Sequence, residues 1–132
     1  MIVKAIRLLA LEYPPLTALI GFRWQPDGEG QGAALPRITH ILVDDVPTPP
    51  TQTGPSGLFK ARIQINILAT DETQAQAVAT QLRAALAGRR GFYGGMRIDS
   101  VFQVGDKSDY ESDPIVYKRI MDFIVTHTEA RT

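Results

Sequence analysis

The chain has 132 residues, and its fourteen basic side chains balance fourteen acidic ones. This balance disfavours a protein that grips the phosphates of nucleic acids, because such proteins usually carry a basic excess. The chain has no cysteine, which excludes disulfides and thiolate metal sites, and no apolar run of about 18 residues that would predict a membrane span. A chain of this length is expected to form a single domain over residues 1–132.

The N-terminal residues predict a short amphipathic helix. Ile2, Ile6 and Leu9 recur at helical spacing within residues 2–12. The helix should end before Pro14, because a residue that precedes proline avoids helical backbone angles. The segments expected next are one helical turn at residues 16–20, an extended piece at 22–24, a loop at 25–36 and a strand at 39–43.

Residues 46–57 form the most irregular segment of the sequence. Four prolines stand there among threonines and glycines, and proline lacks the amide proton that a sheet ladder requires. We predict a flexible arm between two antiparallel strands, with a loop that has no task as the alternative. The centre of this arm comprises Thr48, Pro49, Pro50, Thr51, Gln52, Thr53 and Gly54.

Residues 58–69 carry the clearest strand signal. Apolar side chains alternate there with polar ones, which predicts a strand with one buried face and one polar face. The apolar face comprises Ala61, Ile63, Ile65 and Ile67, and the polar face comprises Arg62, Gln64 and Asn66. The polar face is therefore available to contact another molecule.

A capped helix is predicted directly after that strand. Asp71 is a favoured N-cap residue, and Gln74 three positions later completes a capping box. Gly88 is placed to end the helix. The apolar side chains at helical spacing are Ala75, Val78, Ala79, Leu82 and Leu86. The helix and the preceding strand are expected to pack on each other.

The last third of the chain predicts two further strands. Residues 96–104 and 115–126 alternate, an acidic loop at 105–114 separates them, and a basic, glycine-containing connection at 89–95 comes before them. Residues 115–126 are apolar on both sides, so this strand is either central or buries its second face against a partner. The predicted fold is α+β: a mainly antiparallel four-stranded sheet with an N-terminal helix and one long helix packed on one face.

The sequence shows no pattern typical of catalysis or metal binding. His40 and His127 lack a second ligand at metal-binding spacing, and a surface or edge-strand position is favoured for both. No serine stands in a strand–turn–helix elbow. The glycine-rich residues 28–32 lack the helix of a phosphate-binding loop, and the acidic loop misses the calcium-binding pattern. We therefore expect no enzymatic activity, no metal and no cofactor.

The order of several segments carries a resemblance to a known family. The most specific part is the strand over residues 61–65 followed by a helix rich in alanine, leucine and arginine. The segments that carry the resemblance are residues 16–21, 35–38, 54–66, 75–86 and 117–125. Through them, from Leu8 to Thr128, the chain resembles the tail-completion or tail-terminator proteins of long-tailed bacteriophages and of related prophage and gene-transfer particles.

This resemblance implies a structural protein of the virion tail or neck, assembled in the cytoplasm of the bacterial host. Its partners would be further copies of itself, the tail tube protein and a head–tail connector. A ring, usually of six subunits, would sit on the head-proximal end of the tail tube, end tube polymerisation and offer a surface to the head. DNA would pass through the lumen without specific binding, and no membrane would be involved.

Polarity and charge suggest where such a ring would form its contacts. Basic residues gather between Arg83 and Arg97, and acidic residues follow from Asp99 to Asp113. Complementary patches of this kind suit head-to-tail association, and two solvated surfaces are the alternative. The candidate interface residues are Arg62, Gln64, Asn66, Arg89, Arg90, Asp109, Glu111 and Asp113.

Two other functions are compatible with the sequence. A different neck protein, such as a head–tail connector or adaptor, would be more helical. A regulatory module that binds a small molecule on an α+β fold would be stabilised by its ligand.

Overall fold

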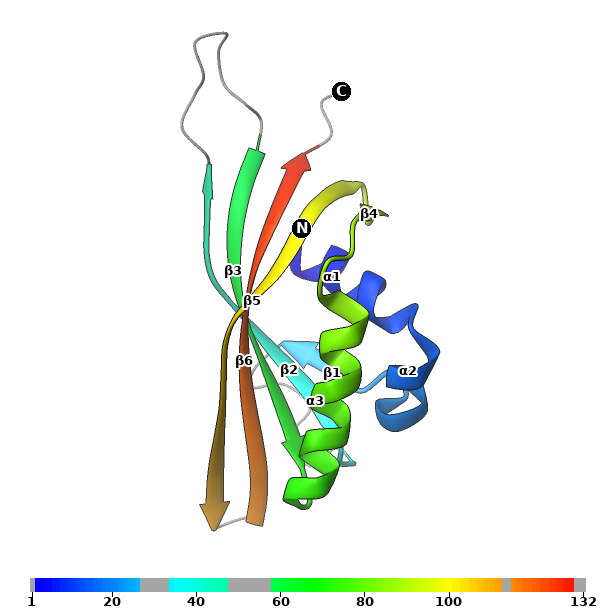
Figure 1. Cartoon of the computed structure of the whole chain (residues 1–132), viewed down its shortest axis with the longest axis vertical. Helices are drawn as coiled ribbons and strands as arrows, with labels where there is room; N and C mark the ends of the chain where they lie inside the picture. Colours follow the sequence, from blue (N-terminus) through cyan, green and yellow to red (C-terminus); the bar gives the residue numbers. More distant parts are fainter. Residues whose placement is uncertain (1, 27–33, 48–57, 113–114, 130–132) are drawn as a thin grey trace, which may run out of the picture.

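The computed structural model describes residues 2–26, 34–47, 58–112 and 115–129. The helices and strands, in chain order, are α1 Ile2–Leu11, α2 Pro14–Ile20, β1 Trp24–Pro26, β2 Arg37–Pro47, β3 Leu58–Ala69, α3 Glu72–Leu86, β4 Gly91–Tyr93, β5 Met96–Ser112 and β6 Ile115–Glu129. The helices cover one face of a six-stranded sheet in the order β1-β2-β3-β6-β5-β4 (Figure 1). β1 and β2 are parallel, and all other neighbours are antiparallel.

The α+β class is confirmed, but the predicted four-stranded antiparallel sheet with two helices is wrong in detail. The sheet is mixed and has two additional edge strands, β1 and β4, of three residues each. Segments this short give no periodic signal in a sequence. The helical turn predicted at residues 16–20 is a third helix, α2, which begins two residues earlier at Pro14 and Pro15; these prolines were expected only to end α1. Proline is favoured in a first helical turn, where its missing amide proton would have no partner.

β5 differs most from its predicted extent. It continues through residues 105–112, predicted as an acidic loop, and it stays paired with β6 as far as Ser112. Register shifts occur within residues 98–100 and 103–105. Each bulge adds one unpaired residue and bends the strand, so the alternation in the sequence is interrupted while the pairing continues.

One hydrophobic core lies between the helices and the sheet. α1 and α3 each bury one apolar stripe, and the apolar face predicted for β3 is buried against them. The largest fully buried side chains are Trp24, Phe123, Ile2, Ile6, Leu9, Leu16, Ile20, Ile38, Ile63, Ile65, Ile67 and Leu82. This packing fixes which face of every long strand points away from the helices.

The ends of α3 are close to their prediction. The Asp71 carboxylate accepts a hydrogen bond of 2.7 Å from the backbone N–H of Gln74. The Gln74 side chain completes the cap one residue earlier than a capping box would, because its Oε1 accepts from the backbone N–H and the hydroxyl of Thr70 at 2.8 and 2.9 Å. Gly88 follows the helix with φ of 72°, a conformation that favours glycine at this position.

Candidate interaction surfaces

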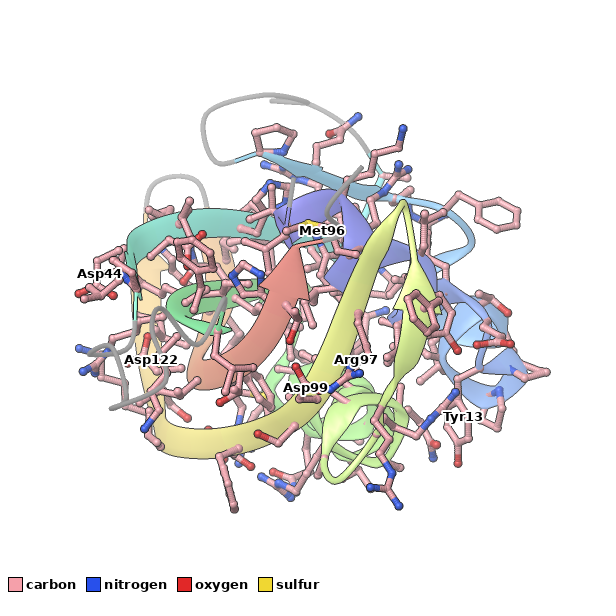
Figure 2. The ribbon with its side chains drawn as sticks, turned by 90° about the horizontal axis from the view of Figure 1, so that it is seen from above. Tyr13, Asp44, Met96, Arg97, Asp99 and Asp122 are labelled. Carbon is pink, nitrogen blue, oxygen red and sulfur yellow. The ribbon has the colours of Figure 1, made fainter. Side chains whose placement is uncertain are left out.

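The sheet face opposite the helices carries the predicted polar row. Ile63 and Ile65 are buried against the helices, and successive side chains of a strand point to opposite faces. Arg62, Gln64 and Asn66 therefore lie on the other side of the sheet, which we name the open face. Figure 2 shows this side through the labelled carboxylates of β2 and β6, which lie away from the helices.

The central position of β6 explains its apolar side chains on both faces. Met121, Phe123 and Val125 are buried against the helices, which places Ile120 and Ile124 on the open face. β6 pairs with β3 on one side and with β5 on the other. Of the two alternatives predicted for this strand, a central place in the sheet is confirmed.

The three polar residues of β3 differ in accessibility. The Arg62 side chain is 46% exposed, and its guanidinium lies 3.4 Å from the Asp122 carboxylate. An exposed ion pair of this kind contributes little to stability, so Arg62 can exchange its partner at low cost. Asn66 is only 1% exposed and accepts a hydrogen bond of 3.3 Å from the Gln64 amide. Arg62 is therefore the residue of this row that is most accessible to a binding partner.

The two short edge strands leave long parts of β2 and β5 without an outer strand neighbour, although the backbone N–H of Gly88 donates a hydrogen bond of 3.2 Å to the Val101 carbonyl of β5. β1 pairs with β2 at residues 38–40, and β4 pairs with β5 at residues 96–98. Within the described part of the chain, residues 41–46 have β3 as their only strand neighbour, and residues 100–105 have only β6. We name these segments the β2 window (residues 41–46) and the β5 window (residues 100–105). An outer strand without a neighbour presents a row of backbone N–H and C=O groups that can pair with another chain.

Exposed apolar side chains are concentrated in the two windows. Eight large hydrophobic residues are exposed among the described residues, and five of them lie in these segments. The β5 window contains Phe102, which is 66% exposed, and Val104; the β2 window contains Ile41, Val43 and Val46. Single exposed apolar residues are ordinary on a protein surface, whereas their accumulation marks an interaction surface.

The two predicted arginines after α3 have different environments. Arg89 donates a hydrogen bond of 3.3 Å to the Glu12 carboxylate, and the Tyr93 hydroxyl donates to the same carboxylate. The bond to Glu12 raises the pKa of the Tyr93 hydroxyl. Arg90 is exposed and, with Arg97 and neighbouring residues of β4 and β5, lines a hollow of about 270 Å³. Arg89 thus ties the turn to the end of α1, whereas Arg90 is available to a partner.

Two of the three predicted acidic interface residues lie in a strand and not in a loop. Asp109 and Glu111 belong to β5, where they pair with Lys118 and Val116 of β6. Asp113 lies outside the described residues. The acidic run was predicted as a loop because a hairpin that is polar on both sides shows no alternation of apolar and polar residues.

Asp106 is the carboxylate that the fold surrounds with basic side chains. It accepts two hydrogen bonds of 2.8 Å from Arg119 and one of 2.8 Å from Arg83. The paired guanidinium of Arg119 holds the pKa of the Asp106 carboxyl below its ordinary value. Arg119 also donates to the side chain of Gln76, so the network joins β5 and β6 to α3. Asp106 was not among the candidate interface residues, and it stands in the supposed loop.

His127 lies at the base of the segment predicted as an arm. Its ring is fully buried on β6, so the predicted surface or edge position is wrong. Nε2 lies 2.9 Å from Oδ1 of Asp45, and the ring stacks on Phe59 with centroids 5.5 Å apart. Nδ1 has no hydrogen-bond partner within the described residues. Asp45 and Phe59 lie near the ends of β2 and β3 on either side of residues 48–57, which lie outside the described residues.

The described residues show neither a metal-binding cluster nor a membrane-spanning helix. They contain no group of three or more histidine, cysteine, aspartate or glutamate residues placed to hold a metal ion. The other histidine, His40, accepts a hydrogen bond of 3.0 Å from the Trp24 indole through Nδ1. No helix in the described ranges has the length and apolar character required to cross a membrane.

The fold has a counterpart in a solved virion structure. A chain in the virion of a native gene transfer agent particle superposes with a TM-score of 0.74 and 15% sequence identity. The match covers 94% of this chain and 92% of that chain. At this identity the similarity establishes a shared fold. A comparison with curated protein sequences finds no match.

The sequence also matches a family model. Residues 4–128 match the model described as tail completion protein gp17. The chain therefore belongs to the tail completion protein family, and the resemblance found in the sequence is confirmed. Members of this family are structural proteins of phage tails, so the protein has a structural role in the tail of a phage or a related particle.

Proposed function

We propose that this protein caps the head-proximal end of the tail tube as a ring of copies. The ring ends polymerisation of the tube and offers a surface to the head–tail connector. The family match over residues 4–128 is the observation that carries the proposal. The ring has six subunits, as the family resemblance implies, and forms in the cytoplasm of the host. DNA passes through its lumen without being held, which the equal numbers of acidic and basic residues favour.

The two windows support self-association. Apart from Gly88, whose backbone N–H donates to the Val101 carbonyl, they have no outer neighbour on the sheet within the described residues, and they carry exposed apolar side chains at opposite edges of one sheet. Because the β2 window and the β5 window differ in sequence, a contact between them is heterologous. Heterologous contacts close into a ring when the rotation between neighbours permits it.

The fold also bears on the two alternative functions. The helices comprise 10, 7 and 15 residues, and the six strands contain more of the chain, which disfavours a helix-rich connector. The hollow at Arg90 has a volume of about 270 Å³, below the roughly 300–1,000 Å³ of typical ligand pockets. This hollow by itself therefore gives little support to a small-molecule site among the described residues.

Tube growth tests the proposed function directly. Tail tubes of the same particle would be incubated with this protein, supplied with fresh tube subunits and imaged by negative-stain electron microscopy. We expect added density at one end of each tube and no elongation from that end. Elongation from both ends, with no added density, would reject the proposal.

A further inference from the structure

The two windows lie at the same level on opposite edges of the sheet. Three rows of paired residues connect them across β3 and β6: Val46 with Lys60, Thr126 and Ser100; Asp44 with Arg62, Ile124 and Phe102; and Ile41 with Gln64, Asp122 and Gly105. The pairing of β1 with β2 ends at His40, and the pairing of β4 with β5 ends at Ile98. The uncovered part of each outer long strand is therefore level with the uncovered part of the other.

The two windows also run in opposite directions. The four long strands from β2 to β5 alternate in direction, because each pair of neighbours is antiparallel. If two copies stand side by side in the same orientation, β5 of the first copy is antiparallel to β2 of the second. The alternation of the sheet then continues across the contact without turning either copy over.

We propose that the β5 window of one copy pairs with the β2 window of the next copy as antiparallel strands. This inference rests on the proposed ring and names the contact that would build it. The pairing gives the outer backbone groups of residues 41–46 and 102–105 a strand neighbour that the described residues do not provide, whereas the Val101 carbonyl is already bonded to the backbone N–H of Gly88. It also brings together Ile41, Val46 and Phe102, which all lie on the open face and are exposed in the single chain.

The windows carry features that weaken pairing between free copies. Each contains a bulge, between Leu42 and Asp44 in β2 and between Gln103 and Gly105 in β5. Bulges and charged side chains on outer strands are common protections against uncontrolled edge-to-edge association. Pairing is therefore stronger where a tube end holds several copies side by side, because the second contact then forms at a high effective concentration.

Engineered cysteines test the pairing. The natural chain has no cysteine, so the introduced thiols are the only thiols in each variant. Within one copy, the windows are separated by three strand spacings, about 14 Å, whereas a disulfide needs Cα atoms closer than about 7 Å. A disulfide between the windows must therefore join two copies. Double variants would combine one cysteine at residue 41, 44 or 46 with one at residue 100 or 102, in every combination.

Mild oxidation of these double variants beside tail tubes has a defined expected result. At least one combination, such as Val46→Cys with Ser100→Cys, should give a ladder of covalent multimers that ends at the size of the ring. The two matching single variants should give covalent dimers when mixed and none when oxidised separately. A control with two exposed thiols on α3, Glu72→Cys with Thr80→Cys, should give no ladder.

Two results would overturn the inference. The first is no ladder from any combination, both beside tubes and in concentrated solution of the chain alone. The second is covalent dimers from the single variants alone, which would show a two-fold contact. Imaging the same samples separates the two proposals. Capped tubes without a ladder would support the proposed function and reject the pairing. A ladder with bare tube ends would support the pairing and reject the proposed function.

Discussion

The two faces of the sheet illustrate how the same strands serve stability on one side and contact on the other. Phe123 on β6 faces the helices and is 1% exposed, whereas Phe102 on β5 faces away from them and is 66% exposed. The residues are close in the sheet, because Phe102 pairs with Ile124, the next residue after Phe123. Two phenylalanines in neighbouring strands thus have opposite surroundings, and substitutions at these positions separate folding from assembly.

Phe123→Ala is expected to have the largest effect on stability. Phe123 is among the largest fully buried side chains, and its removal leaves a cavity between β6 and the helices. Losses of this kind cost about 3–5 kcal/mol in the free energy of unfolding. Urea denaturation followed by circular dichroism would measure the change. A loss below about 1 kcal/mol would show that the side chains between the sheet and the helices are not tightly packed around Phe123.

Phe102→Asp is expected to affect assembly rather than folding. An exposed side chain contributes little to folding, so the free energy of unfolding should change by less than about 0.5 kcal/mol. Capping of tail tubes should weaken by about tenfold, because an aromatic residue central to a contact is lost. Titration of tubes with the variant, counted by electron microscopy, gives the measurement. Phe22→Asp is the matched control, since Phe22 is 72% exposed but lies outside both windows; equal loss of capping in both variants would contradict the role of Phe102.

Asp106→Asn tests the ion-pair network between Asp106, Arg119 and Arg83, on the sheet face that the helices cover. Arg119 lowers the pKa of the Asp106 carboxyl, so the carboxylate stabilises the folded chain at neutral pH. The variant should be less stable by about 1 kcal/mol at pH 7, a typical size for a partly exposed ion pair with good geometry. This difference should shrink as the pH falls below about 4, through the lowered pKa of the folded state. Urea denaturation at several pH values measures this difference in the free energy of unfolding. If the charge of Asp106 did not stabilise the fold, the difference would be the same at every pH.

Charge reversal at the turn after α3 should give the smallest effects. Arg89→Glu places a carboxylate beside Glu12 in place of the present ion pair, and we expect a loss of about 0.5–1 kcal/mol. Arg90→Glu alters an exposed side chain, so stability should change by less than about 0.5 kcal/mol. Thermal unfolding of both variants, with capping assays on each, would separate a structural from an interface role. Normal capping by Arg90→Glu would remove Arg90 from the interface.

The parts of the fold that were predicted from the sequence are those with local periodicity. β3 was predicted with its observed bounds, and α3 was predicted from its N-cap at Asp71 to Gly88. β1 was predicted only as an extended piece displaced by two residues, at 22–24, and β4 and residues 105–112 of β5 were missed. Three-residue strands contain too few positions to show alternation, and an exposed hairpin needs no apolar face. Their place in the sheet is decided by long-range pairing, which sequence patterns do not report.

The candidate surfaces were predicted only in part. The polar row on β3 was found, because alternation assigns Arg62 and Gln64 to the face opposite the buried isoleucines. The buried state of Asn66 and the ion pair of Arg89 depend on neighbours far away in the chain. The windows were missed because their definition requires knowing where β1 and β4 stop. Apolar residues such as Phe102 and Val104, in a segment that later becomes polar, were the available signal.

The equal level of the two uncovered edges bears on how such an assembly would terminate. If each copy joins the next without any displacement along the strands, successive copies gain no rise along the axis. When the rotation between neighbours also permits closure, a chain of contacts without rise returns to its first member and leaves no free attachment point, whereas a small displacement along the axis at each step would generate an endless spiral. A molecule that stops a filament from growing must not start one of its own, and level edges favour that outcome.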